Sequence, residues 1–422
     1  MNTNNQRITR RSVMAAGWAS TLAAPALGQG ANRPIRIGHV SPRTGPLAAF
    51  GEADAFVQEG ILRAIGQGIR VGNRIHPVQI LSRDSQSNPS RAAEVAAELI
   101  LRDRVDLITA AAAPDTVNPV SDQAEVNEVP CITTNCPWQP YFFGRRGDPQ
   151  RGFEWTWHFF WGLEDVIDAF LALWSGAETN KVVGGLFPND ADGNAWGDSR
   201  LGLPPALARN GYRLIDTGRF QPFSNDFTAQ ISAFKAANVQ IVTGNLTPPD
   251  FATFWTQAGQ QGFRPKIVTI GKALLFPSAV AALGERGHGL STEIWWTPSH
   301  PFRSGLTGQT ARELAAAYTQ ATGRPWTQPV GYQHALFEVA IDVLKRAERL
   351  EPRAILDAIR RTDYRSIIGP VRWGSGPVKN VAKTLLVAGQ WKRRPNGAFD
   401  LVVTTNATAP EIPVGGQLEL LD

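Results

Sequence analysis

Short β-rich runs alternate with amphipathic helical stretches along most of the chain, and this alternation constrains the fold more than any other feature. In the first part, strands are expected at 35–40, 76–82, 105–109 and 130–133, with helices at 52–65, 88–102 and 117–127. Parallel strands need long crossovers, usually helices, between them. The pattern therefore predicts a parallel sheet with helices on both faces.

The pattern pauses in a Pro-, Gly- and Arg-rich stretch at 137–152, so a second α/β unit is expected to begin near residue 153. Its expected strands are 154–160, 181–186, 212–216, 239–243 and 266–270. Helical stretches at 310–322, 332–349 and 352–361 follow, and then strand-like pieces at 367–373 and 383–391. About 395 residues remain after the N-terminal segment, more than one hydrophobic core usually serves, so two lobes of one architecture are expected.

Residues 1–28 have the features of a twin-arginine export signal. Arg10 and Arg11 precede an apolar run at about 13–27, and small residues at 24–26 suit cleavage. The run is too short and too rich in Ala and Gly for a membrane-spanning helix, which needs about 20 apolar residues. The sequence therefore predicts export to a bacterial periplasm by the twin-arginine route.

Charge and motifs argue against several classes of function. The formal net charge is +5, but without residues 1–28 the chain carries 39 basic and 37 acidic side chains. This balance gives no reason to expect a nucleic acid or an anionic membrane surface as a partner. Phosphate-loop, zinc-helix and nucleophile-elbow signatures are absent. Asp115, Asp190, Asp192 and His300 offer acid and base groups, yet no nucleophile–base pair is visible. We therefore expect no enzymatic activity, no cofactor and no metal.

The only two cysteines are Cys131 and Cys136. An oxidising compartment favours a short disulfide loop between them, and two buried thiols are the alternative. The spacing is not C-x-x-C and no histidine lies close in sequence, which argues against a metal or redox role.

Tryptophans concentrate at the ends of expected strands and in the loops after them. They are Trp138, Trp155, Trp157, Trp161, Trp196, Trp255, Trp295 and Trp296. Ligands of open α/β sheets bind outside the carboxyl ends of the strands, and a tryptophan offers a rigid face and one N–H donor. For Trp155 and Trp157, which alternate within a strand, core packing is the favoured interpretation. Trp196, in the polar loop NDADGNAWGD, is expected to face a ligand.

Several loops together resemble one family. SPRTGPLAAFG, DSQSNPSRAAEVAAELI and TVNPVSDQAEVNEVPCIT follow the first three strands, LFPNDADGNAWGD lies in the second half, and IIGPVRWG and LLVAGQW close the pattern. In order and spacing they resemble periplasmic solute-binding proteins of the branched-chain amino acid type, which serve ABC importers. The resemblance implies an α/β fold with two Rossmann-like lobes, parallel central sheets and three hinge crossovers.

The resemblance also implies domain boundaries and partners. One lobe is expected at 34–155 plus 298–365, the other at 156–297 plus 366–395, and a C-terminal tail at 396–422. The expected partners are a small-molecule ligand and the permease subunits of an ABC importer in the inner membrane, and the protein is expected to be a monomer.

The family's ligand contacts fall by motif on several positions of this chain. Phe50 matches the aromatic residue that closes on the ligand from the first loop, and Trp196 matches the aromatic residue of the second lobe. The carboxylate-binding loop falls on Ala113, Pro114, Asp115 and Thr116, and a further contact site on Thr134, Asn135 and Pro137. Lys272 occupies the place of the acidic residue that receives the ammonium group, with a one-residue uncertainty in register. Trp138 is expected to form part of the wall.

Two departures from the family pattern bear on the ligand. The carboxylate loop has become Pro-Asp-Thr, and the ammonium acceptor has become a lysine. A buried lysine needs an anionic partner, either the ligand or Asp115, unless its side chain points to solvent. We therefore expect an apolar or aromatic carboxylate, or an amide, in place of a free amino acid. The alternatives are binding of a branched-chain or other amino acid, a soluble ligand-sensing relay, and an exported enzyme.

Overall fold

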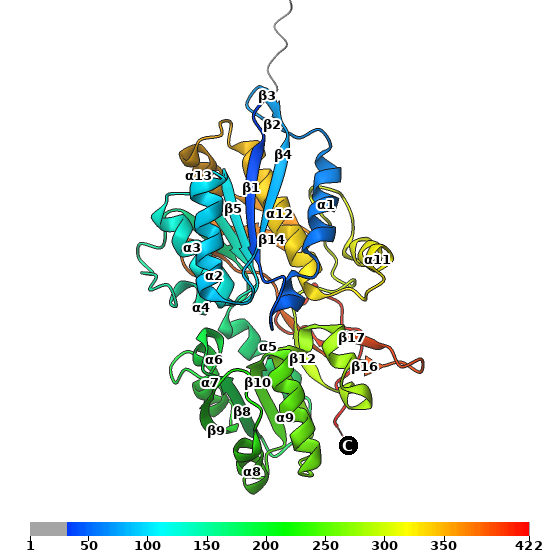
Figure 1. The fold of residues 1–422 in the computed structure, drawn as a ribbon. Helices are drawn as coiled ribbons and strands as arrows, with labels where there is room; N and C mark the ends of the chain where they lie inside the picture. Colours follow the sequence, from blue (N-terminus) through cyan, green and yellow to red (C-terminus); the bar gives the residue numbers. More distant parts are fainter. Residues whose placement is uncertain (1–31, 422) are drawn as a thin grey trace, which may run out of the picture. The chain divides into compact units, whose positions relative to one another are not determined.

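The computed structural model describes residues 32–421, so the expected signal segment at 1–28 lies outside the described residues. Two main sheets organise the described part (Figure 1). We call the first sheet with its helices lobe 1 and the second sheet with its helices lobe 2.

The sheet of lobe 1 has six parallel strands. Their spatial order is β15 (Val381–Ala382), β7 (Thr156–Phe159), β6 (Cys131–Thr134), β5 (Leu107–Ala111), β1 (Ile35–Ser41) and β4 (Val78–Asp84). Apart from β15, the neighbouring strands of this sheet are thus β4, β1, β5, β6 and β7 in that order. This is a doubly wound, Rossmann-like order. A small hairpin of β2 (Ile69–Val71) and β3 (Arg74–His76) stands apart from this sheet.

Strand alternation directs side chains of lobe 1 to two separate cores. Ile35 and Ile37 pack in the core that includes α1 (Asp54–Ile65) and α12 (Gln328–Arg346). Val40 packs with α2 (Pro89–Ala97) and α3 (Pro114–Val126) on the other face. The side chain of Asn88 accepts from the backbone N–H of Arg91 and caps α2, as the sequence predicts.

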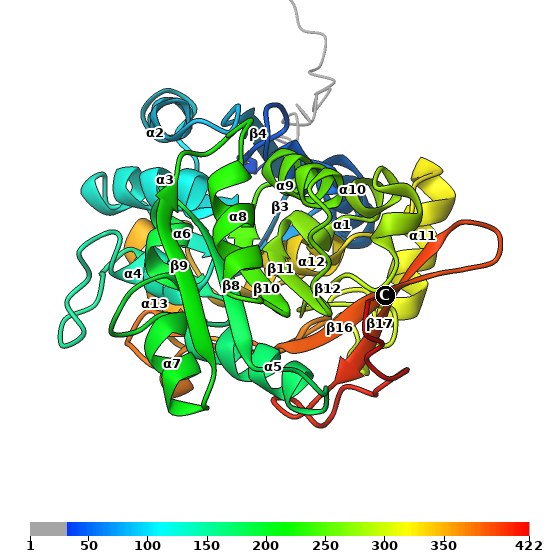
Figure 2. The same cartoon turned by 90° about the horizontal axis from the view of Figure 1, so that it is seen from below.

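Lobe 2 contains a seven-stranded sheet (Figure 2). Its order is β17 (Phe399–Thr405), β16 (Val387–Arg393), β12 (Ser291–Ile294), β11 (Ile267–Lys272), β10 (Ile241–Leu246), β8 (Val182–Pro188) and β9 (Arg213–Phe220). The five strands from β12 to β9 are parallel, and β16 and β17 add to the β12 edge in antiparallel pairing.

Helices cover both faces of this second sheet as well. Those that pack on one face are α5 (Leu163–Ser175) and α7 (Leu203–Arg209), and those on the other are α8 (Thr228–Ala236) and α9 (Pro248–Gln260). The parallel sheets in two lobes confirm the predicted fold class.

The lobe boundaries differ from the expected ones. Strand β7 was expected to begin lobe 2, but it pairs with β6 in the sheet of lobe 1. In this register the backbone N–H of Cys131 donates to the carbonyl of Trp155. The hairpin β13 (Asp363–Ser366) and β14 (Gly369–Arg372) contacts α12, and β15 joins β7, so both belong to lobe 1. The chain therefore changes lobes near 160–162, 295–310 and 383–386, later than expected at the first and third crossings.

The expected C-terminal tail is also part of lobe 2. Strand β17 completes its sheet, and the backbone N–H of Leu421 donates to the carbonyl of Lys266 at 2.8 Å. The remaining helices are α4 (Trp138–Phe142), α6 (Ala191–Trp196), α10 (Pro277–Ala281), α11 (Ala311–Thr322) and α13 (Pro352–Arg360). No helix of the described residues is both long and apolar enough to cross a membrane.

Candidate functional site

A narrow cavity with a volume of about 30 Å³ lies where the strands of both lobes end. Residues at or just after the carboxyl ends of parallel strands line it from each lobe. They are Phe50, Ala113, Asn135, Cys136, Pro137, Phe160 and Trp161 from lobe 1 and the first crossing, and Asp192, Trp196, Asn245, Lys272, Leu275, Glu293 and Trp295 from lobe 2 and the second crossing. This is the position at which doubly wound sheets bind ligands.

Six of the eleven expected ligand-contact residues line this cavity: Phe50, Ala113, Asn135, Pro137, Trp196 and Lys272. They come from both lobes, as the family pattern implies. Their contact with a ligand remains a prediction, because the lining residues define the walls of the cavity and not the contacts of a ligand.

The other five expected residues do not line the cavity and mostly have structural partners. Thr134 donates to the carbonyl of Phe159 at 2.7 Å, and Thr116 shares a 3.0 Å hydrogen bond with Ser85. Trp138 donates its indole N–H to Glu164 at 3.0 Å. Pro114 and Asp115 occupy the first turn of α3, where proline at the first helical position is favoured.

Aromatic side chains form much of the wall and link the lobes. The Phe50 ring of lobe 1 meets Phe276 of lobe 2 edge-on, with ring centroids 5.0 Å apart. Phe160 meets Trp295 edge-on at 5.1 Å. Trp196 is buried against Phe170 at the end of the short helix α6, so the polar loop around it folds into a helix and presents the indole to the cavity. Trp155 and Trp157 are core residues, as expected.

Lys272 is buried at the end of β11, and its charge is already paired. Its Nζ lies 2.7 Å from Asp192 and 3.8 Å from Asp190. Burial alone would lower the pKa of Lys272, but the charges of Asp192 and Asp190 outweigh this effect and raise it. The alternative that Lys272 points to solvent is therefore wrong, and its anionic partners come from α6 and the residue before it.

Three acidic groups near Lys272, those of Asp192, Glu293 and Asp115, have raised pKa values. Burial raises the pKa of Asp192 to about 6, although the charge of Lys272 opposes the shift. Burial raises the pKa of Glu293 to about 7. One Glu293 oxygen accepts from the backbone N–H of Lys272 at 3.2 Å, and the other accepts from the hydroxyl of Thr292 at 2.9 Å. Burial also raises the pKa of Asp115, which lies within electrostatic range of Lys272. The charges of Asp192, Asp190 and Asp115 thus act on the Lys272 ammonium, and Glu293 holds its backbone.

Lys272 also has an unusual backbone conformation, with φ of +64° and ψ of −60°. A non-glycine residue at this φ is strained, and such residues concentrate at functional sites where the surrounding structure fixes them. The accepting carboxylate of Glu293 is one of the contacts that fix it.

Sequence reasoning did not place Asn245 and Glu293 in the site, and it named Asp192 only as an acid, whereas Trp161 and Trp295 were among the tryptophans that it placed at strand ends. A positional signal for all of them was present in the chain. Asn245, Glu293 and Trp295 lie within or directly after β10 and β12, and Asp192 and Trp161 lie shortly after β8 and β7. Applying the strand-end rule to polar residues as well as to tryptophans would have found the polar ones.

Cys131 and Cys136 are free, buried thiols, so the expectation of a disulfide is wrong and its stated alternative holds. Cys131 faces the core that α2 and α3 cover, whereas Cys136 packs with α4 beyond the end of β6. The two side chains therefore belong to different clusters. Burial raises the pKa of the Cys131 thiol to about 12, so it stays protonated near neutral pH.

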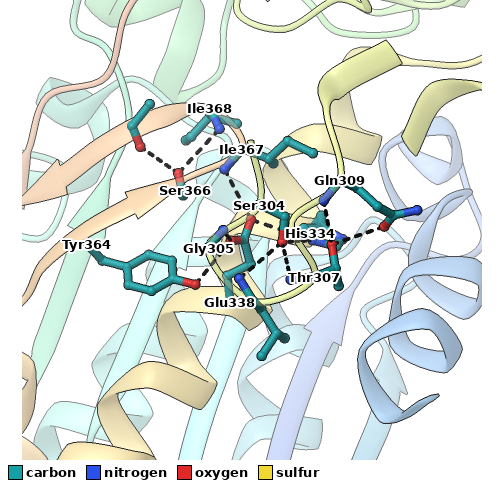
Figure 3. Close-up of polar contacts among 12 residues, drawn as sticks. Ser304, Gly305, Thr307, Gln309, His334, Glu338, Tyr364, Ser366, Ile367 and Ile368 are labelled. Carbon is teal, nitrogen blue, oxygen red and sulfur yellow. Dashed lines mark hydrogen bonds and ion pairs between the residues drawn. The ribbon is translucent and has the colours of Figure 1, made fainter. Parts of the chain in front are cut away.

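A second polar cluster, away from the cavity, contains residue types of a hydrolase triad (Figure 3). Ser304 lies 2.9 Å from Nε2 of His334, and Glu338 lies 3.6 Å from the same nitrogen. A triad needs the acid and the nucleophile on opposite ring nitrogens. Glu338 instead accepts from the backbone N–H groups of Gly305 and Ile367, at 2.8 and 3.1 Å. This buried cluster therefore ties the second crossing to α12 and the β13–β14 hairpin.

Comparison with solved structures places the fold. A type 1 periplasmic binding protein from Bordetella pertussis has a TM-score of 0.73 at 18% identity, over 88% of this chain and 100% of that one. A leucine-binding protein from Thermotoga maritima has a TM-score of 0.69 at 21% identity, over 87% and 97%. A solute-binding protein of an ABC transporter from Rhodopseudomonas palustris, in complex with 3,4-dihydroxybenzoic acid, has a TM-score of 0.70 at 16% identity, over 89% and 98%. At these identities the likeness establishes the fold.

The family is established by sequence. A family model described as periplasmic binding protein matches residues 34–396, nearly the whole of both lobes. Proteins of this family bind small molecules, are typically not enzymes, and are exported to the periplasm. The chain therefore belongs to the periplasmic binding proteins, the solute receptors that work with ABC transporter permeases.

Proposed function

We propose that this protein captures a small solute with an apolar or aromatic body between its lobes and delivers it to an ABC importer. The polar end of the solute is a carboxylate or an amide. The observation that carries the proposal is the cavity at the strand ends, which residues of both lobes line. A ligand held from both sides favours the closed arrangement of the lobes and shifts the population toward it.

The aromatic wall of the cavity supports an apolar or aromatic body for the solute. Phe50 from lobe 1 and Trp196 from lobe 2 both line the cavity, and Phe160, Trp161 and Trp295 complete its apolar side. Flat aromatic faces suit a planar or branched apolar group, and offset stacking adds to the burial of apolar area. A solved relative of this fold holds 3,4-dihydroxybenzoic acid, and another is a leucine-binding protein. Both solutes combine an apolar body with a polar end.

Transport is favoured over catalysis, and a soluble ligand-sensing relay stays the alternative. The Ser304–His334–Glu338 cluster lacks triad geometry. The Cys136 thiol at the cavity lies 3.9 Å from Nε2 of His158, but that nitrogen makes its 2.8 Å contact with the Cys136 carbonyl, and Nδ1 meets a threonine hydroxyl in place of an acid. We further propose that the protein acts as a monomer in the periplasm, without cofactor, metal or nucleic acid, after export by the twin-arginine route. Arg10, Arg11 and the short apolar run support that route.

Ligand binding can be measured directly, because Trp161, Trp196 and Trp295 line the cavity. Intrinsic fluorescence and calorimetry should show saturable binding of at least one solute in a set of leucine, 4-hydroxybenzoate and benzamide. Trp196→Phe should weaken that binding by reducing the stacking area. Leu101→Ala, at an exposed residue that does not line the cavity, should leave it unchanged.

Closure of the two lobes around the ligand can be measured separately. Small-angle scattering should show a smaller radius of gyration with saturating ligand, while the far-ultraviolet circular dichroism stays the same. A bound solute identified by native mass spectrometry of protein from its own host would name the cargo. Turnover of that solute would contradict the proposal in favour of an enzyme.

A further inference from the structure

Six of the buried polar atoms that have no hydrogen-bond partner among the described residues lie on the wall of the cavity, and the others are spread over the fold. The Oδ1 atoms of Asn135, Asn245 and Asp192 lack a donor, and Nδ2 of Asn135 and Nε1 of Trp161 and Trp295 lack an acceptor. All five side chains line the cavity and are at most 4% exposed. Buried polar groups in proteins are almost always hydrogen-bonded. This set therefore indicates a ligand that both donates and accepts.

These atoms approach the cavity from two sides. Asn135 and Trp161 follow strands β6 and β7 of lobe 1. Asn245 and Asp192 belong to lobe 2, and Trp295 follows its strand β12. Each side thus supplies at least one acceptor and one donor. Asn135 has a φ of +67°, which asparagine tolerates better than most residues, and this conformation sets its amide beyond the strand end.

The charges at the site do not favour an anion. Asp192 and Asp190 lie within 4 Å of Lys272, the only cation that lines the cavity, so the lysine charge is already balanced. Glu293 adds a further buried acid on the lobe 2 wall. A carboxylate would enter beside these acids, where like charges repel strongly at low dielectric. It would also bring no donor for the three unpartnered acceptors.

We propose that the polar end of the ligand is an uncharged group that donates and accepts hydrogen bonds, a primary amide in its simplest form. Lys272 then acts as the internal counter-ion of Asp192 and not as the anchor of an anionic ligand. This inference rests on the proposed function and selects the amide over the carboxylate within it.

Three probes of nearly the same shape test directly which ligand charge the cavity prefers. Benzamide is neutral, benzoate is an anion and benzamidine is a cation at pH 7. A second series with an aliphatic body, isovaleramide and isovalerate, covers a smaller apolar group. Calorimetry should give an affinity for the amide at least tenfold higher than for the charged members of the series that binds best.

Two variants test whether Asn135 and Asp192 cause the preference for an amide over a carboxylate. Asn135→Gly removes the amide and keeps the backbone conformation accessible, and it should weaken benzamide binding at least tenfold. Asp192→Asn removes a negative charge and frees Lys272, so it should raise the affinity for benzoate at least tenfold. The matched control is Asp168→Asn, at an exposed aspartate on α5, which should leave the affinities for all probes unchanged. Circular dichroism melts verify folding of each variant.

The outcomes separate this inference from the function on which it rests. Tighter binding of the carboxylate than of the amide in the wild-type protein would overturn the inference and leave solute capture standing. A lower benzoate affinity in Asp192→Asn would also overturn it. Absence of saturable binding for every probe, and for leucine and 4-hydroxybenzoate, would overturn the inference and the proposed function together.

Discussion

Replacing Lys272 with methionine tests whether one buried cation holds the acidic side of the cavity together. Its Nζ lies 2.7 Å from Asp192, and the two side chains are 8% and 5% exposed. Removing one partner of a buried ion pair costs about 3–5 kcal/mol, because the other charge stays buried without compensation. We therefore expect Lys272→Met to lower the free energy of unfolding by about 3–5 kcal/mol at pH 7. That is a large part of the ~5–15 kcal/mol typical of a folded domain.

The loss should depend on pH with a defined sign. The pKa of Asp192 in the folded protein, about 6, lies above its ordinary value of 3.8. Stability from this group is therefore fully present below about pH 3.8 and is lost as the pH rises through the folded pKa. Without the charge of Lys272 the pKa of Asp192 should rise further. The difference between wild type and variant should then be larger at pH 7 than at pH 5.

Urea denaturation followed by circular dichroism at both pH values measures these differences. Lys345→Met, at an exposed lysine on α12, is the matched control and should change stability by less than about 0.5 kcal/mol. The double variant Lys272→Met with Asp192→Asn should recover part of the loss, because it leaves fewer buried charges unpaired. A single variant as stable as the wild type at pH 7, or equally destabilised at both pH values, would refute the reasoning.

Three further predictions concern other parts of the chain. Denaturation without reductant should expose two reactive thiols per chain, from Cys131 and Cys136, and a labelling assay that finds none would restore the disulfide. Changing Arg10 and Arg11 to lysine should leave the precursor in the cytoplasm, and fractionation that finds normal export would contradict the twin-arginine route. Burial raises the pKa of Glu338 to about 7 from an ordinary 4.5, so its stabilising contribution is lost as the pH rises toward and past 7. Glu338→Gln should therefore reduce the decline in unfolding free energy between pH 5 and 8, and an unchanged slope in urea denaturation would count against this assignment.

The alternation of strands and helices predicted the architecture because it reflects local periodicity and the geometry of parallel crossovers. It did not predict where the chain changes lobes. Strand β7 has the same apolar character as the strands of either sheet, and its place beside β6 depends on long-range pairing. Strand β15 has two residues, too few for a periodicity signal, yet it pairs with β7 in the sheet of lobe 1.

In the site, too, features that depend on local sequence could be predicted, and features that depend on long-range packing could not. That Phe50, Asn135 and Trp196 line the cavity could be predicted, because they lie in loops after strands or match an aromatic position of the family. The disulfide expectation failed because sequence separation does not reveal that Cys131 and Cys136 lie in separate clusters.

The charge of Lys272 indicated an anionic ligand in the sequence, whereas in the structure it is paired within the protein. In sequence, a lysine at the place of the family's ammonium acceptor indicated an anionic ligand. In the structure, Asp192 comes from a helix about 80 residues earlier in the chain and lies 2.7 Å from the same nitrogen. A salt bridge within lobe 2 therefore offsets the charge that the substitution introduced, and unpartnered polar atoms of Asn135, Asn245, Asp192, Trp161 and Trp295 lie on the wall of the cavity. The type of a substituted residue thus does not determine the charge of the ligand. The partners that the fold brings to that residue do, and for this site they favour a neutral one.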